Sequence, residues 1–320
     1  MEKNYNKHIP KILDFKEGGI FLALFFLCLG LSLATSSFLT SYNIGILGRQ
    51  ITFVALVALG QTLVLLTAGI DLSVGAVAGL CGILGAKLMV STNIDPYICT
   101  LIAMGIGICV GLINGFFIAK IGLNAFIVTL AIGEICAGIN LVMTRGYPIN
   151  KIPDSFKHLG RGMIGPFPVP VIILLIITTI LILILRNTPY GRNIYAIGGN
   201  EQASRLVGIR VVAIKMSVYA IAGMLSALAG MIFVSRMNSG QPTIGPSWLM
   251  PSVTAAIIGG TSLSGGEGTV FGTILGAIFM GVLANGIVLL DISPYWEKVI
   301  IGSVVVIAVL IDYLRKRNRL

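Results

Sequence analysis

The chain has 320 residues, of which 56% are hydrophobic and only 11% are charged. Since about a quarter of the residues of a soluble protein are charged, this composition excludes an ordinary water-soluble domain. The net charge of +10 would suggest nucleic-acid binding in a soluble protein. With so few charges, basic loops on the cytoplasmic side of a membrane explain it better. The expected partner is therefore the lipid bilayer and no nucleic acid.

The first apolar stretch follows a basic segment, residues 1–17, that contains Lys3, Lys7, Lys11 and Lys16. A cleaved signal peptide has the same order of a basic and an apolar region. However, the charge-free run at residues 18–48 is longer than the apolar region of about 7 to 15 residues in a signal peptide. We therefore expect a cytoplasmic tail at residues 1–17, followed by the first membrane span.

Further apolar runs follow at residues 50–70, 72–86, 96–119, 121–144, 162–185, 216–235, 237–266, 269–290 and 299–311. A helix needs about 20 apolar residues to cross a hydrocarbon core of ~30 Å. The pattern predicts an all-α, polytopic membrane helix bundle of about ten transmembrane helices, forming a single domain at residues 18–314. The longest inner loop, residues 187–214, is far shorter than the ~100 residues of an ordinary soluble domain.

The basic residues indicate which side of the membrane each end faces. With ten spans both termini lie on one side, and 14 of the 22 Lys and Arg residues then fall on that side: four in the N-terminal tail, Lys120, five between Arg186 and Lys215, and four in a basic tail at residues 315–320. This distribution predicts that both termini are cytoplasmic. Arg145, Lys151, Lys157 and Arg161 depart from it, because they share one outer loop.

Small residues indicate how the helices pack. Glycines recur every four residues at positions 107, 111 and 115, and again at 268, 272 and 276. Lipid chains give no hydrophobic drive for helix association, so close backbone approach at such positions is typical of a membrane bundle. A weak internal repeat aligns residues 66–86 with 257–277, including an identical Ile-Leu-Gly-Ala run at 83–86 and 274–277. It suggests two halves, each with a helix broken by Gly, Ser and polar residues, as in transport pathways.

The segment 67–73 places polar residues between two spans, among them Thr67, Asp71 and Ser73. Asp71 can cap a helix that begins at Leu72, accepting from its free N–H groups and complementing its dipole. Direct contact with a substrate is the alternative.

Glu134 lies in the middle of an apolar span, residues 124–144. An ionisable group at that depth is unfavourable by about 2.5 kcal/mol or more and normally faces the bundle interior. Asn124, Thr129 and Asn140 could share its face. Glu134 either lines a pathway or makes a buried structural hydrogen bond.

The inner loop contains a short helix signal at residues 198–208. Asn200 is a good N-cap, Glu201 and Arg205 form a favourable i, i+4 pair, and Gly208 supplies a stop. So short a helix is unstable alone in water. It needs a surface to dock on, either its own bundle or a partner protein.

Neither a metal site nor a nucleotide site is indicated. The five cysteines (Cys28, Cys81, Cys99, Cys109 and Cys136) fall in predicted spans without metal-like or redox spacing, and His8 and His158 have no cluster around them. No Lys follows a Gly, so the Gly-Lys pair of a phosphate-binding loop is absent. We expect no cofactor and no enzymatic activity, with any ATP hydrolysis carried out by another chain.

Four motifs together resemble the permease subunit of ribose-type ABC importers, over residues 20–314. They are Gly-Gln-Thr-Leu at 60–63 with Thr-Ala-Gly-Ile-Asp-Leu-Ser-Val-Gly at 67–75, Gly-Gly-Asn-Glu-Gln-Ala-Ser-Arg at 198–205, Ile-Gly-Gly-Thr-Ser-Leu-Ser-Gly-Gly at 258–266, and Ser-Pro-Tyr-Trp at 293–296.

The resemblance implies a multi-pass protein of a bacterial cell membrane that pairs as a homodimer, with the pathway at the dimer axis. An extracytoplasmic sugar-binding protein would deliver a monosaccharide, and a cytoplasmic ATPase subunit would bind a coupling helix at residues 200–206. The residues implied in coupling are Asn200, Glu201, Gln202, Ala203, Ser204, Arg205 and Gly208. Those expected in the pathway or at broken helices are Gln61, Thr67, Asp71, Ser73, Asn124, Glu134, Asn140, Thr261, Ser262 and Ser264.

Two alternatives remain at this point. A secondary transporter would use Glu134 or Asp71 as a proton relay, and a permease for branched-chain amino acids would need a path for a zwitterion. The motifs favour a sugar, while its identity would depend mostly on the binding protein.

Overall fold

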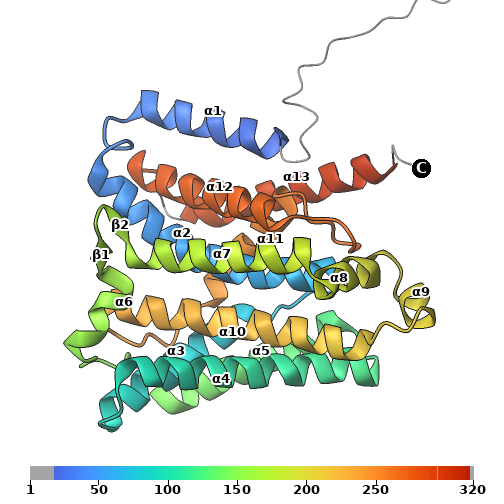
Figure 1. Ribbon diagram of the computed structural model, residues 1–320. Helices are drawn as coiled ribbons and strands as arrows, with labels where there is room; N and C mark the ends of the chain where they lie inside the picture. The colour runs from blue at the N-terminus through green and yellow to red at the C-terminus, as the bar shows by residue number, and fades with distance from the viewer. Residues whose placement is uncertain (1–17, 294, 318–320) are drawn as a thin grey trace, which may run out of the picture.

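The computed structural model describes residues 18–293 and 295–317, and its helices run back and forth between two ends of one bundle (Figure 1). The predicted tail at residues 1–17, with His8, lies outside the described residues, as do Pro294 of the fourth motif and the last residues, 318–320. The all-α prediction is confirmed.

The helices of the bundle are α1 (Gly18–Ala34), α2 (Ser41–Leu66), α3 (Val74–Ser91), α4 (Pro96–Gly115), α5 (Ala125–Thr144), α7 (Val169–Asn187), α10 (Val211–Met237), α11 (Pro246–Ile258), α12 (Val270–Leu289) and α13 (Tyr295–Arg317). A π-helical segment, η2 (Phe116–Ile121), extends α4. The connections hold the 3-10 helix η3 (Asp154–Phe156), the short helices α6 (Lys157–Arg161), α8 (Pro189–Gly199) and α9 (Glu201–Leu206), and the strands β1 (Met163–Ile164) and β2 (Phe167–Pro168).

Seven of the described helices are long and apolar enough to cross a membrane: α2, α3, α4 with η2, α5, α7, α10 and α12. The charge-free run at residues 237–266 was predicted as a full span, but it does not form one helix of spanning length. Its helix, α11, has 13 residues, which is about 20 Å at a rise of about 1.5 Å per residue. The chain before α11 is irregular, with Asn238 and Gly245 at positive φ, and the helix ends at Gly259.

Helices α2 and α10 form the centre of the bundle. In the most apolar part of each span, 83% of α2 and 78% of α10 is buried, against 33%, 28% and 22% for α4, α5 and α7. These three helices leave large apolar side chains exposed along their length, as expected where lipid or another chain covers them.

The predicted glycine packing is confirmed. A Cβ atom added to Gly107 or Gly111 on α4 would collide with the backbone of α10, at Gly223 and Tyr219 respectively. A Cβ atom at Gly276 on α12 would collide with Ala255 of α11. Larger side chains at these positions would force the helices apart.

The two segments of the internal repeat have the same local structure, and they touch. In each, a helix ends, a short irregular segment follows, and a second helix begins: α2 to α3 across residues 67–73, and α11 to α12 across residues 259–269. The Gly266 N–H group donates to the Leu66 carbonyl oxygen (3.0 Å). The hydroxyl oxygens of Thr62 and Thr273 are 2.6 Å apart.

The two ends of the bundle differ. Helices α8 and α9 lie at one end, which we call the α9 end (Figure 1). Helix α6 and the hairpin of β1 and β2 lie at the other, the hairpin end. The strands pair antiparallel, with Met163 opposite Pro168 and Ile164 opposite Phe167.

Candidate functional site

Asn200 organises the chain at the α9 end. It ends α8, and its side-chain Oδ1 accepts from the Ala203 N–H group (2.9 Å), so it is also the N-cap of α9. Gly208 follows the helix with φ +82°, a conformation that favours glycine. The predicted cap and stop are both confirmed.

Glu201 connects α9 to its own last turn and to the central helix α10. Its Oε1 lies 2.6 Å from Arg205 Nη2, and its Oε2 lies 2.8 Å from Lys215 Nζ. The i, i+4 pair was predicted, whereas Lys215 was missed. Lys215 is 14 residues away along the chain, beyond any local helical pattern, and only the turn at Gly208 brings it back to α9.

The two cations keep Glu201 ionised. Burial raises the pKa of the Glu201 carboxyl, but hydrogen bonds and charge from Lys215 and Arg205 outweigh this and leave the pKa below its ordinary value of 4.5. A carboxylate with a depressed pKa contributes its stability above the unfolded-state pKa and loses it as the pH falls through the folded value.

We therefore expect the attachment of α9 to α10 to be constant from neutral pH down to about pH 5 and to loosen only in stronger acid. A spin-label distance between the two helices measures it. The Glu201→Gln variant, which cannot ionise, should show a looser attachment that does not vary with pH. Loosening of the parent chain between pH 6 and 7 would contradict this assignment.

The C-terminal tip of α9 is apolar and exposed. Leu206 and Val207 are 89% and 76% exposed, whereas Ser204 is buried and its Oγ donates to the Asn200 carbonyl (2.8 Å). Gln202 and Ala203 are also exposed. Apolar side chains exposed together at the tip of a polar loop indicate a surface that contacts a partner.

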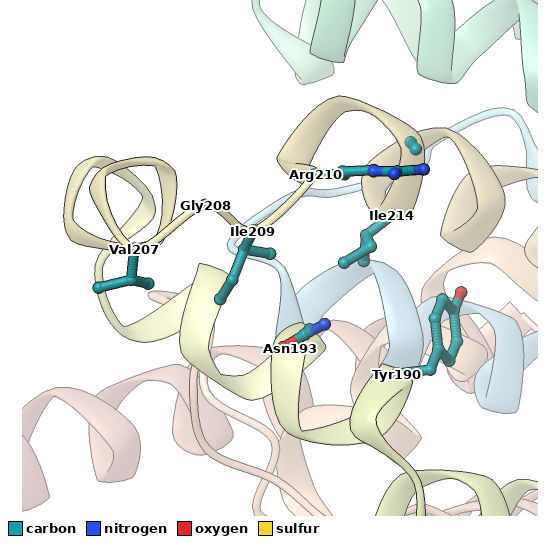
Figure 2. Close-up of a pocket in the computed structure, with 8 residues that line it drawn as sticks. Tyr190, Asn193, Val207, Gly208, Ile209, Arg210 and Ile214 are labelled. Carbon is teal, nitrogen blue, oxygen red and sulfur yellow. The ribbon is translucent and has the colours of Figure 1, made fainter.

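Two open grooves flank the turn between α9 and α10. Figure 2 shows one, of about 460 Å³, lined by Tyr190 and Asn193 from α8 and by Val207, Ile209 and Ile214. The other, of about 530 Å³, includes Lys120 and Arg205 in its lining. Residues Ile209, Arg210 and Ala213 line both grooves, so the surface around α9 is hollowed on two sides.

A buried polar cluster holds the break between α2 and α3. Asp71 Oδ1 accepts from the Ser73 N–H group (2.8 Å) and the Ser73 hydroxyl (2.5 Å). Asn114 Nδ2 donates to Ser73 Oγ (2.8 Å). The Gln61 side-chain amide, oriented to satisfy both groups, donates to the Asp71 carbonyl oxygen (3.1 Å) and accepts from the Asp71 N–H group (3.3 Å). All four residues are buried.

The cluster corrects the predicted role of Asp71. The expected helix start at Leu72 was wrong, because α3 begins at Val74, and Asp71 binds the N–H group of Ser73, the residue before the helix. The Gln61 amide holds the backbone of Asp71 and so keeps it out of the helix. Asn114 was not predicted, since nothing near it in the sequence distinguishes it from other polar residues on a glycine-rich helix.

Other predicted residues lie at the two breaks. The Thr67 hydroxyl donates to the Val64 carbonyl (2.9 Å) and ends α2. Thr261 and Ser262 are buried in the second break, and Ser262 Oγ accepts from the N–H group of the exposed Ser264 (3.1 Å). The structure thus brings the predicted residues of both breaks to neighbouring positions.

Helix α5 separates the polar residues that were expected on one face. Thr129 and Asn140 are buried: Thr129 Oγ1 accepts from Leu72 N (3.0 Å), and Asn140 Nδ2 donates to the Pro242 carbonyl (2.8 Å). Glu134 and Asn124 are exposed, and Asn124 caps the helix. The shared face was wrong because at about 100° per residue Glu134 is turned away from both Thr129 and Asn140.

Comparison with known proteins identifies the family and the relatives of this chain. A family described as branched-chain amino acid transport system, permease component, matches residues 43–309. The chain is 44% identical to the ribose import permease protein RbsC of Bacillus subtilis, over 94% of this chain and 93% of that protein. It is 42% identical to RbsC of Haemophilus influenzae, over 91% of each chain. The D-allose transport system permease protein AlsC of Escherichia coli is 34% identical, over 93% of this chain and 92% of that protein. No solved structure matches the chain.

Proposed function

Because this chain belongs to the ribose-type permease family of ABC importers, we propose that it forms the pathway by which a monosaccharide enters a bacterial cell. Its relatives at 33–44% identity are named as permeases for ribose, D-allose, fructose and L-arabinose. These names favour a sugar over a branched-chain amino acid. The chain is a membrane transport subunit, and a separate ATPase supplies the energy.

The observation that carries the proposal is the exposed apolar tip of α9. We assign it as the contact with the ATPase, with Asn200 to Arg205 and Gly208 shaping the turn that presents Leu206 and Val207. The flanking grooves offer room for side chains of that partner. Its affinity for this surface would differ between inward-open and outward-open states, which is how hydrolysis can shift their populations.

We propose an orientation in which the α9 end and both termini face the cytoplasm. The ten bundle helices would then be the ten predicted spans, with α11 as a half-helix that reaches only part of the way through. The basic residues of the 187–214 loop support this orientation. The polar residues buried at the two breaks, Gln61, Thr67, Asp71, Ser73, Thr261 and Ser262, would hold these helix junctions rather than contact sugar.

We propose that two copies of the chain pair, with α5 near their interface. Glu134 is exposed on α5, and no hydrogen bond or ion pair to it occurs among the described residues. A carboxylate facing lipid at mid-helix is unfavourable by about 2.5 kcal/mol or more. A second copy, with a wet sugar pathway between the two, would remove that cost.

A substitution series at Glu134 tests this. Glu134→Gln keeps a hydrogen-bonding group in the pathway and should retain most uptake, whereas Glu134→Leu should lower uptake roughly tenfold without changing the amount of dimer. Labelled-sugar uptake by proteoliposomes and dimer mass in detergent are the measurements. Normal uptake with raised thermal stability in the Leu variant would instead place Glu134 against lipid.

Reconstitution tests the function as a whole. The chain alone should show no ATPase activity, and the complex with the ATPase should hydrolyse ATP faster when a sugar-loaded binding protein is added. Uptake abolished by an uncoupler at constant ATP would favour the ion-coupled alternative. Stimulation of ATP hydrolysis by a branched-chain amino acid and not by a sugar would favour a permease for branched-chain amino acids.

A further inference from the structure

Three arginine side chains gather at the hairpin end. Arg49 comes from α2, Arg161 is the last residue of α6, and Arg236 lies in the last turn of α10. The Arg161 Nε–H group donates to the Arg236 carbonyl oxygen (2.6 Å). Arg49 and Arg161 are both near enough to Arg236 to repel its charge. The fold therefore holds three like charges together, which is unfavourable unless an anion compensates them.

Within the part of the chain that the structure describes, none of the three arginines has an ion pair with a carboxylate. Among the residues that the structure describes, Arg49 donates only to the Gly45 carbonyl (3.4 Å) and to the sulfur of Met163 (3.1 Å), and its buried Nε has no partner. Sulfur is a weak acceptor. Most of the donors on this guanidinium group are therefore unused.

One of the three arginines, Arg236, is supported by buried aromatic rings. The Arg236 guanidinium lies over the ring of Phe53, 5.5 Å from its centroid. Phe53 in turn stacks on Trp248 (5.6 Å between centroids, 9° between planes). Both rings are buried in the core. Such a support fixes a cation before any ligand arrives, which lowers the entropy lost on binding.

Exposed apolar residues lie beside the charges. On the hairpin, Met163, Ile164 and Phe167 are 45%, 57% and 57% exposed, and Met163 contacts Arg49. Arginine, methionine and aromatic residues are the types enriched at protein interfaces. We call Arg49, Arg161, Arg236, Met163, Ile164 and Phe167 the arginine patch.

The patch also stands out against the charge distribution of the chain. The connection from Arg145 to Arg161 contains four Lys and Arg residues and one acid, Asp154. In the proposed orientation this positive segment lies outside the cell, where basic residues are normally depleted. A basic outer surface attracts an acidic partner and speeds its encounter.

We propose that the arginine patch is the docking site for carboxylates on the extracytoplasmic sugar-binding protein, with the hairpin side chains as its apolar anchors. This inference rests on the proposed function. A lipid phosphate group is the competing anion. Arg49 and Arg236 come from α2 and α10, the two most buried spans. The patch therefore lies at the centre of the bundle and not along its lipid-facing helices.

Arg161→Glu tests the proposal in the reconstituted permease–ATPase complex. The measured quantity is the concentration of sugar-loaded binding protein that gives half-maximal ATPase stimulation, using a binding protein that stimulates the parent complex. The variant loses the hydrogen bond from Arg161 Nε to the Arg236 carbonyl oxygen, but the new carboxylate would offset the charges of Arg49 and Arg236, so the thermal unfolding temperature should change little. Docking should nevertheless weaken by roughly tenfold or more, as expected when a charge-assisted contact becomes repulsive. Added salt should weaken the parent more than the variant.

Two further variants separate the patch from general effects. Arg49→Gln, which removes a charge but keeps a donor for the Gly45 carbonyl, should also weaken docking. Lys87→Glu, at an exposed position of α3, changes the net charge of the same end by the same amount as Arg161→Glu. It should leave the half-maximal concentration of binding protein within about twofold of the parent value.

Half-maximal concentrations equal to that of the parent for Arg161→Glu and Arg49→Gln would overturn the assignment. So would an effect seen in nanodiscs with anionic lipid and not in phosphatidylcholine alone, which would assign the patch to a lipid headgroup. Failure of every sugar-binding protein to stimulate the parent complex would overturn the proposed function, and this inference with it.

Discussion

Replacing Leu206 by Asp should abolish co-purification of the ATPase and reduce sugar uptake by a similar factor, while the chain still reaches the membrane in normal amounts. Leu206 is 89% exposed and makes no contribution to the core, so the fold does not depend on it. Burying a leucine side chain in a partner contributes about 1.5–3 kcal/mol. An aspartate in the same position would have to lose its hydration without compensation, which makes the loss of affinity roughly a hundredfold or more.

Two controls separate apolar contact from other effects of the substitution. Leu206→Met keeps the size and apolar character of the side chain and should retain most co-purification and uptake. Arg205→Glu introduces repulsion against Glu201 within α9, so it tests the integrity of the turn separately. If Leu206→Asp retained both the ATPase and uptake, the tip of α9 would have no part in coupling.

A second feature of this end is the connection through which movement of α9 can reach the bundle. Glu201 is bonded to Arg205 within α9 and to Lys215 on α10, and α10 lies at the centre of the bundle. A bond from a surface turn to a central helix provides a physical path along which docking can bias the conformation. Glu201 and Lys215 belong to different helices, so local helix spacing predicts the bond from Glu201 to Arg205 but not the bond from Glu201 to Lys215.

The sequence predicts local features at the α9 end well. Capping at Asn200 and the stop at Gly208 depend on backbone rules that act over three or four residues. The glycine spacing on α4 and α12 also predicted close packing correctly, because such spacing lets any neighbouring helix approach closely. These features need no knowledge of which helix lies next to which.

Features that depend on the identity of the neighbour were not predicted. The charge-free run that contains α11 satisfies the composition of a span, yet positive φ angles at Asn238 and Gly245 shorten the helix. Glu134 was expected beside Thr129 and Asn140, but α5 turns it outward. Asn114 completes the cluster at Ser73 from a different helix. Each of these follows from tertiary packing, which composition and periodicity do not specify.

The cluster at the first break leads to the other large expected effect. Asp71→Leu should prevent stable assembly, whereas Asp71→Asn should be tolerated much better. Asn retains a side-chain oxygen that can accept from the Ser73 N–H and hydroxyl groups, as Asp71 Oδ1 does. Leu leaves both buried donors without an acceptor, and each such group costs about 1–3 kcal/mol. That loss is a large part of the 5–15 kcal/mol by which a typical folded protein is stable.

The thermal unfolding temperature of the purified chain in detergent, together with its level in the membrane, measures this difference. Ser73→Ala provides a matched comparison, since it removes the Ser73 hydroxyl but keeps the backbone bond to Asp71. In an Asp71→Leu background it should restore no stability, because removing the Ser73 hydroxyl donor also leaves the buried Asn114 Nδ2 group without its acceptor. The same pair of Asp71 variants also separates structure from chemistry. A proton relay at Asp71 requires an ionisable group, so Asp71→Asn would then fold normally and lose uptake completely. If the Leu variant were as stable as the Asn variant, the hydrogen-bonded junction would not be what holds the break between α2 and α3.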